Sequence, residues 1–298
     1  MKEDIKRTLI TSMLQKIFRD GKRSPRRTVR NLVDLGLNVS KGRFQTRFLT
    51  YAQEMLQNQE SAYYELAADV IAHTDERLLI NFGMNLGYNG CTKGASLIRK
   101  TEKEQGVHIP WSLSMNIDSR MPEQEADACQ KQICRGKEQG IYVYLMTLTQ
   151  GNPAELLKVL NRNPDCAFLV FLGEQEISET FAKEIVECGN AMVSVPTRPD
   201  SAQNCRLMRN NGLLYAVHAG YGEEDADRML DDSWLKKQLF LHPQCAFICA
   251  DWECRREIRQ KVYDHVVDVR MRQKYPVLLM EVREDLQMID HIISEKRI

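Results

Sequence analysis

Cysteine is the residue type here with the widest chemistry, because the chain of 298 residues contains nine cysteines. Cys245, Cys249 and Cys254 form a C-x3-C-x4-C run, a spacing that superficially resembles thiolates arranged around an iron–sulfur cluster. The same segment, QCAFICA, is short and continuously apolar, which predicts a strand. Along a strand, residues 245 and 249 lie roughly 13 Å apart, too far to share a metal. The run therefore predicts no cluster.

The other candidate chemistry is equally sparse. Cys129 and Cys134 lie five residues apart on a predicted helix, which does not align them on one face. The six histidines form no H-x-H or H-x-x-x-H pair, and no G-x-S-x-G nucleophile elbow is present. An odd number of cysteines in apolar segments favours reduced core thiols. The sequence thus predicts no metal site and no catalytic residue.

Charge separates the chain into two parts, although Lys plus Arg and Asp plus Glu are equal at 41 each. Residues 1–47 carry 13 basic and 4 acidic side chains, a net charge of +9, so the remainder carries 28 − 37 = −9. Apolar residues at helical spacing predict a basic amphipathic helix over residues 2–19. This arm is expected either to bind nucleic acid or an anionic membrane, or to pack on the body with its basic side solvated.

The N-terminus, MKEDIKRTLITSML, has no uninterrupted apolar core and no small-residue cleavage site. No run approaches the roughly 18 apolar residues of a membrane-spanning helix. We therefore expect a cytoplasmic protein. The 43% apolar fraction is ordinary for a globular domain.

The elements that would position any site change character near residue 106. Before it, the patterns are helical, and the four glycines between residues 80 and 106 favour close helix packing or turns over a phosphate loop. After it, apolar strand-like segments alternate with helical ones. The predicted strands are 111–117, 141–148, 167–172, 191–195, 213–219, 246–250 and 277–282. The predicted helices are 122–139, 153–161, 178–188, 200–210, 223–237 and 254–274. We expect a helical extension over 1–106, packing on an α/β body over 107–298 with parallel strands.

Several short segments of that body carry a resemblance. IPW opens the first strand, RGKEQGIYVYLMT leads through the second, and NPDCAFLVF, AMVSV, GLLYAVH and YPVLLMEV follow in order. In order and spacing, residues 81–284 resemble the radical S-adenosylmethionine family. The resemblance implies a partial (β/α) TIM-type barrel with an N-terminal helical extension.

The loops depart from that family. Its members carry a C-x3-C-x2-C loop after the first strand, whereas this chain has DSRMP at residues 118–122. The turns that receive the cofactor in the family correspond here to Leu148–Gln150, Leu172–Glu174 and Pro196–Arg198. The resemblance therefore implies a degenerate, cluster-free member, in which neither a [4Fe–4S] cluster nor S-adenosylmethionine is expected. Such a pseudoenzyme would act as a binding or regulatory protein, with an active relative as a possible protein partner.

Any ligand is expected at the barrel mouth, where the carboxyl ends of the strands meet. A mixed polar set would line it: Asp118, Arg120, Gln150, Glu174, Arg198, His218, Asp251 and Glu281. Arg120 or Arg198 could bind a small anion or zwitterion. Two alternatives stay open. The chain could be an enzyme of another class with Glu174, His218, Asp251 or Glu281 as acid or base, or these charges could neutralise one another in a collapsed cleft.

Overall fold

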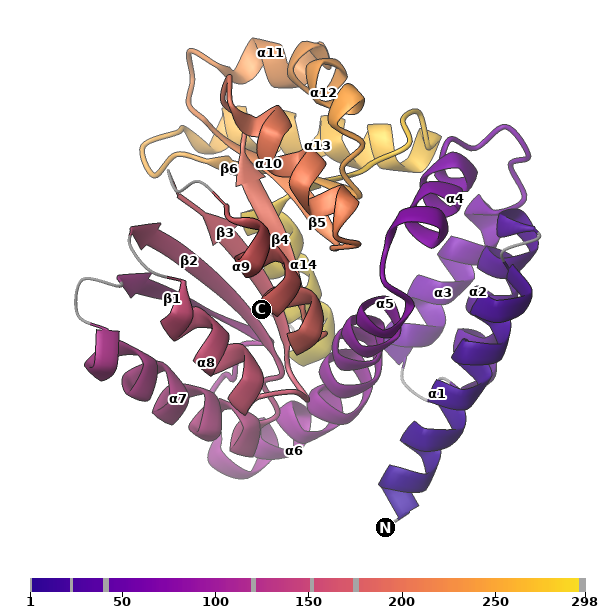
Figure 1. The fold of residues 1–298 in the computed structure, drawn as a ribbon, viewed down its shortest axis with the longest axis vertical. Helices are drawn as coiled ribbons and strands as arrows, with labels where there is room; N and C mark the ends of the chain where they lie inside the picture. Colours follow the sequence, from indigo (N-terminus) through magenta and orange to yellow (C-terminus); the bar gives the residue numbers. More distant parts are fainter. Residues whose placement is uncertain are drawn as a thin grey trace.

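Seven parallel strands form a single sheet in the computed structural model of the protein (Figure 1). The structure describes residues 2–21, 24–39, 43–118, 122–150, 153–173 and 177–294. The strands are β1 Ser112–Asp118, β2 Val143–Gln150, β3 Ala167–Leu172, β4 Ala191–Pro196, β5 Tyr215–Tyr221, β6 Cys245–Ala250 and β7 Leu278–Glu281. Their spatial order is the order of the sequence, β1 to β7. A doubly wound sheet would reverse direction at a switch point, so this winding is that of a barrel.

A helix follows each strand and returns the chain to the start of the next. The helices after β1 are α7 Pro122–Gln139, α8 Ala154–Arg162, α9 Glu179–Cys188, α10 Ser201–Asn210, α11 Ala226–Leu230, α12 Ser233–Gln238, the 3-10 turn η2 Leu239–Leu241, α13 Arg256–Arg272 and α14 Val282–Ser294. This alternation confirms the predicted α/β class, and it explains why parallel strands are possible, since each crossover needs room to turn back.

The sheet is curled into a partial barrel. Phe171 on β3 and Phe247 on β6 have ring centroids 5.7 Å apart, although two strands lie between them. In a flat sheet three inter-strand spacings would place these strands roughly 14 Å apart. The rings meet because both point into the concave side. β1 and β7 are not paired with each other, so the barrel is open at its two edges.

The two faces of the sheet differ in burial. On β1, Met115 and Ile117 face outward and are 6% and 1% exposed under the helices. Ser114 and Asn116 alternate with them, face the concave side and are exposed. The hydrophobic core therefore lies between the sheet and its outer helices, where burying apolar surface supplies the main stabilisation.

The described residues before β1 are helical apart from short connections. The helices are α1 Lys2–Gly21, α2 Pro25–Val39, α3 Arg43–Met55, α4 Tyr63–His73, α5 Glu76–Gly83, the π-helix η1 Met84–Gly94 and α6 Ala95–Gln105. η1 meets the chain just before β3. The buried Asn85 donates to the carbonyls of Pro164 and Cys166 at 2.9 and 2.8 Å, and Asn89 donates to that of Asp165 at 2.7 Å.

Two of the four glycines between residues 80 and 106, Gly90 and Gly94, serve close packing, as predicted, whereas a Cβ atom on Gly83 or Gly87 would meet nothing within 4 Å. A Cβ atom on Gly94, the last residue of η1, would lie 2.3 Å from the carbonyl oxygen of Gly140. Gly140 in turn has a φ of +105°, and a Cβ atom there would lie 2.5 Å from the carbonyl oxygen of Gly94. Two backbones touch at this point, so neither position has space for a side chain.

Further contacts join the N-terminal helices to the barrel. Arg209 of α10 pairs with Asp69 of α4, with Nη1 2.8 Å from Oδ2. The backbone N–H of Asp75 donates to the carbonyl of Gly212 at 2.8 Å, and Asp75 caps α5 by accepting from the N–H of Leu78. The division into two domains at residue 106 stays a prediction.

The structure differs from the sequence prediction in two elements. The helix expected over 223–237 is two short helices, α11 and α12, separated at Asp232, whose φ is +62°. The buried Asp232 carboxylate accepts hydrogen bonds from His265, Lys274 and Tyr275, and these long-range contacts hold the break. Helix α14 was not predicted, although Leu286, Ile289 and Ile293 follow a helical period.

Candidate functional site

A pocket of about 610 Å³ lies at the C-terminal ends of β4 and β5, beneath α12. It occupies the end of the barrel toward which the strands run, where α11 and α12 lie in Figure 1. The residues that line it are Pro196, Thr197, Arg198, Pro199, His218, Ala219, Gly220, Arg228, Ser233, Trp234, Lys237 and Gln238. The pocket thus contains two of the residues predicted for the barrel mouth, Arg198 and His218.

Strand pairing places those two residues side by side. Pro196, the last residue of β4, is in register with His218 on β5. Immediately beyond it, the Thr197 N–H donates to the His218 carbonyl at 2.9 Å. On the opposite wall, Trp234 of α12 donates its indole N–H to the Thr197 hydroxyl at 3.3 Å. These bonds fix α12 over the strand ends and define the depth of the pocket.

His218 is neutral in this setting. Its Nδ1 lies 2.9 Å from the Ser194 hydroxyl, and its ring meets the edge of Phe171 with centroids 5.3 Å apart. Burial and the positive charge of Arg198 lower the pKa of His218 to about 4. Near pH 7 the imidazole therefore offers one N–H donor and one acceptor nitrogen.

Arg198 is held in place by its neighbours but still reaches solvent. Its Nη2 donates to the Gly173 carbonyl at 3.2 Å, and its backbone N–H donates to the Ser201 hydroxyl at 2.6 Å. Its Nε is 3.7 Å from the exposed carboxylate of Asp200. The side chain is 29% exposed, so solvent reaches part of it.

The lining of the pocket is electropositive. Arg198, Arg228 and Lys237 contribute three cations, and none of the described residues that line it is an Asp or Glu. Two exposed acids partner these cations from outside the lining, Asp200 beside Arg198 and Asp225 at 3.1 Å from Arg228. The lining also holds uncharged donors in Thr197, Ser233 and Gln238. This set of donors is suited to an anion.

The other predicted mouth residues have different surroundings. Glu281, at the end of β7, is fully buried, and its oxygens accept the backbone N–H groups of Ala250 and Glu284 at 3.0 and 2.7 Å. Burial raises the pKa of Glu281 above its usual value. Asp251 is exposed and lies against Gly220 and Gly222. Neither lines the pocket.

The remaining four predicted residues lie at the ends of β1 to β3. The backbones of Asp118 and Gln150 pair across β1 and β2, after an irregularity in the register. Their side chains, together with Arg120 and Glu174, lie outside the described part of the chain. Ligand binding by these four residues stays a prediction.

Most residues of the pocket were not predicted from the sequence, among them Arg228, Trp234 and Lys237. All three lie between β5 and β6, in a connection that reaches over the mouth. The general rule that barrel sites use the loops at the carboxyl ends of strands pointed there. The sequence predicted one continuous helix over residues 223–237 instead of two short helices over the mouth.

The cysteines do not fit an iron–sulfur cluster. Cys245 and Cys249 lie four residues apart on the extended strand β6, and Cys254 is buried beyond it. Burial raises the pKa of all three thiols, that of Cys245 to about 12. Among the described residues, no group of three or more His, Cys, Asp or Glu is arranged to hold a metal ion.

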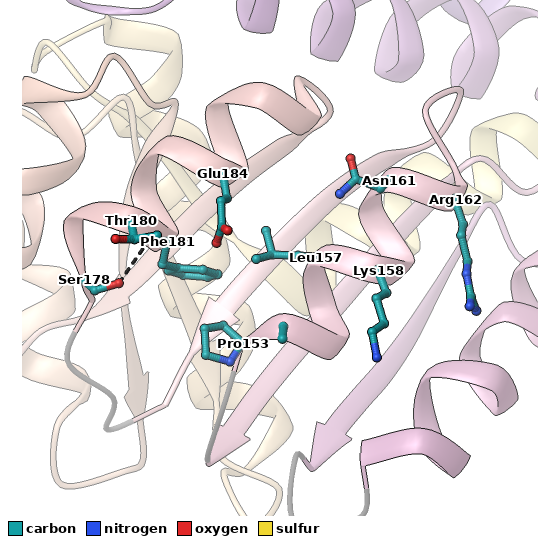
Figure 2. A pocket seen from close by; sticks show the side chains of 10 residues that line it. Pro153, Leu157, Lys158, Asn161, Arg162, Ser178, Thr180, Phe181 and Glu184 are labelled. Carbon is teal, nitrogen blue, oxygen red and sulfur yellow. Dashed lines mark hydrogen bonds between the residues drawn. The ribbon is translucent and has the colours of Figure 1, made fainter.

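A second pocket, of about 660 Å³, lies between α8 and α9 on the outer side of the barrel. Figure 2 shows Leu157 and Phe181 approaching each other from the two helices, while Lys158 and Arg162 point away. These two cations are already paired: Lys158 lies 2.6 Å from Glu155, and Arg162 lies 3.0 Å from Asp127. The groove is shallow, apolar in its floor and mixed in charge at its rim, and it has no group poised for chemistry.

Comparison with known proteins does not identify a family for this chain. No protein-family model and no curated protein matches the sequence. One similar solved structure is the FeFe-hydrogenase maturase HydG from Carboxydothermus hydrogenoformans, with 10% sequence identity and a TM-score of 0.38. The match covers 96% of this chain and 74% of that one. Separately, no helix among the described residues is long and apolar enough to cross a membrane.

Proposed function

We propose that this chain is a cluster-free relative of radical S-adenosylmethionine proteins that binds a small anion at its barrel mouth. The observation that carries the proposal is the acid-free lining around Arg198, Arg228 and Lys237, within a body whose net charge is −9 outside residues 1–47. Local charge opposite to that of the surrounding surface is the electrostatic footprint of an anion site.

Binding is favoured over acid–base catalysis by the state of His218. A general base works best with a pKa near the operating pH, but the pKa of His218 is lowered to about 4. At neutral pH its ring is a weak base that serves better as a hydrogen-bond partner. The ligand class shared by these donors is a carboxylate or a phosphate, since both accept paired bonds from a guanidinium.

The loss of the cluster is supported by the sequence. Residues 118–122 read DSRMP and contain no cysteine, and farther along Cys245 and Cys249 lie four residues apart on an extended strand. A role as a binding or regulatory protein, possibly for an active relative, follows from a scaffold that keeps its strands and lacks the family's metal ligands.

Titration calorimetry on the full chain tests the anion site, with inorganic phosphate and malonate as separate probes. We expect binding of at least one probe, weakened about tenfold by Arg198→Gln, because a charge-assisted hydrogen bond is worth about 1.5 kcal/mol or more. Lys237→Gln, an exposed change that preserves the strand ends, should weaken it about threefold. The matched control is Arg206→Gln, which removes an exposed cation from α10. If both anions bind with unchanged affinity to the two pocket variants, or neither binds the natural chain, the anion site is wrong.

Anaerobic reconstitution with iron and sulfide tests the second half of the proposal independently. The protein is expected to retain no stoichiometric iron and to show no visible charge-transfer absorption after desalting. Uptake of four irons per chain would overturn the cluster-free assignment, while leaving the result for phosphate and malonate intact.

A further inference from the structure

Helix α1 displays an exposed stripe of mixed character. Leu9 and Met13 are 55% and 40% exposed, which is unusual for large apolar side chains four residues apart. Lys6 precedes them by one turn, Lys16 follows by one turn, and both are exposed. The spacing of three, four and three residues places all four side chains on one side of the helix.

The opposite side of α1 is firmly docked. Phe18 is 8% exposed and belongs to a small core with Ile80 of α5 and Met84 of η1, against which Ile10 and Leu14 also pack. Arg7 donates to the Asn85 side chain at 3.1 Å. The helix is therefore held by one face, and its exposed stripe is a stable feature of the surface.

Helix α2 extends the basic character of this region. It packs beside α1 at the margin of the molecule farthest from the sheet (Figure 1). Arg26 and Arg27, in its first turn, are exposed, and Arg26 stacks on Tyr64 at 4.9 Å. Arg19, in the last turn of α1, is also exposed, so basic side chains continue from the stripe of α1 to the start of α2.

We propose that the exposed stripe of α1, with the adjacent first turn of α2, binds an anionic lipid membrane surface. Basic residues contribute about 1 kcal/mol each near an anionic bilayer. Aliphatic side chains such as Leu9 and Met13 gain further by entering the boundary between headgroups and acyl chains, while the lysines beside them stay in water. The net charge of +9 over residues 1–47 supplies the long-range attraction.

The apolar members decide between lipid and nucleic acid. A nucleic-acid surface combines cations with aromatic rings that stack on bases. On the described exposed face of α1 the large apolar side chains are leucine and methionine, which cannot stack on bases. Aliphatic groups between lysines instead match an interface in which a helix lies parallel to the bilayer.

The test is co-sedimentation of the full chain with vesicles of phosphatidylcholine alone or with about 30% phosphatidylserine. We expect binding to the anionic vesicles that falls more than tenfold between about 50 and 500 mM salt, because the attraction is screened. Leu9→Ser/Met13→Ser should reduce it about tenfold, and so should Lys6→Gln/Lys16→Gln. Thermal melting shows whether each variant remains folded.

Two matched controls separate this surface from exposure or charge in general. Met271→Ser/Met288→Ser removes two methionines that are 53% and 47% exposed elsewhere, and Lys100→Gln/Lys103→Gln removes two exposed lysines of α6. Both should bind like the natural chain. Absence of vesicle binding, or equal loss in the controls, overturns the proposal. A preference for a single-stranded oligonucleotide, lost with Lys6 and Lys16 but kept without Leu9 and Met13, would assign the surface to nucleic acid instead.

Discussion

The surroundings of His218 determine the charge state of its imidazole. The residue lies at the end of a strand, and its position at the mouth could be predicted from the sequence. Its charge state could not, because that depends on Arg198 and on burial against Phe171, which are far apart in sequence. Because the His218 imidazole is neutral, the charged groups that line the pocket are its arginine and lysine side chains.

The lowered pKa of His218 makes the free energy of unfolding depend on pH. The pKa of His218 is about 4 in the folded chain, below the ordinary value of 6.5. Between these values the unfolded state binds more protons, so stability is complete above about pH 6.5 and falls as the pH drops toward 4. The whole shift corresponds to about 3 kcal/mol at most.

His218→Asn should remove that dependence. Urea unfolding at several pH values between 7.5 and 4.5 is expected to show a smaller loss of stability on acidification for this variant than for the natural chain. His291→Asn, which changes an exposed histidine, serves as the control and should retain the full slope. Identical slopes for His218→Asn and the natural chain would show that His218 does not contribute.

At the scale of elements, the break between α11 and α12 is maintained by one carboxylate. Asp232 is 3% exposed and accepts from His265 at 2.8 Å, Lys274 at 2.6 Å and Tyr275 at 2.8 Å. Burial alone would raise the pKa of Asp232, but these hydrogen bonds lower it to about 2. The break matters because α12 forms one wall of the anion pocket.

Asp232→Asn should therefore destabilise the fold by about 2 to 3 kcal/mol, since it removes the negative charge beside Lys274 and replaces one of the two accepting oxygens by an NH2 donor. The contribution of Asp232 is present above about pH 4 and is lost as the pH falls through 2, so the measurement belongs at neutral pH. Chemical denaturation compares it with Asp227→Asn, an exposed change on α11. Equal midpoints for the two variants would contradict the role of Asp232.

Gly94 and Gly87 of the π-helix η1 allow two matched substitutions whose effects on stability should differ. In Gly94→Ala the new methyl group would meet backbone oxygens of Gly140 and Asn89 at 2.3 and 2.8 Å, so we expect a loss of about 2 to 3 kcal/mol. In Gly87→Ala nothing lies within 4 Å, and the helix should gain about 0.5 to 1 kcal/mol. Thermal denaturation of both variants should show shifts of opposite sign. Shifts of the same sign would argue against close backbone packing at Gly94.

At the scale of the whole molecule, the N-terminal helices and the barrel are joined by a bidentate ion pair. Asp69 and Arg209 are 21% and 19% exposed. Burial opposes ionisation of Asp69, but the hydrogen bonds and charge of Arg209 outweigh it and lower its pKa. A hydrogen bond between the N-terminal helices and the barrel, from the Asp75 backbone N–H to the Gly212 carbonyl, flanks this pair.

Arg209→Gln should loosen this junction. We expect hydrogen exchange followed by mass spectrometry to show faster exchange in α4 than in the natural chain, with little change in β4 and β5, because the sheet keeps its own ladders. Arg206→Gln lies on the same helix, is exposed and should leave α4 unchanged. Uniform acceleration across the chain would mean that the pair supports global stability and has no local role.

The alternating order of strands and helices was enough to predict a parallel sheet, and the family resemblance added the expectation of a partial barrel. Apolar strands such as 167–172 and 191–195 are recognisable from composition alone, and each of the six connections between the strands contains helix where a helix was predicted. The curl of the sheet could not be predicted, because it depends on packing between Phe171 and Phe247. The residues over the barrel mouth were not predicted for a similar reason, because the buried Asp232 carboxylate holds the break between α11 and α12.

The unequal faces of the sheet have an evolutionary consequence. Residues that point outward are fixed by packing, so nearly any change there costs stability. On the concave side, Ser114, Asn116 and Cys249 are exposed, and substitutions at these three positions should be close to neutral for folding, whereas Phe247 on the same side is buried. Sequence drift can therefore change these exposed positions of the inner surface while the scaffold persists. The polar lining of the concave side can thus vary without loss of the fold.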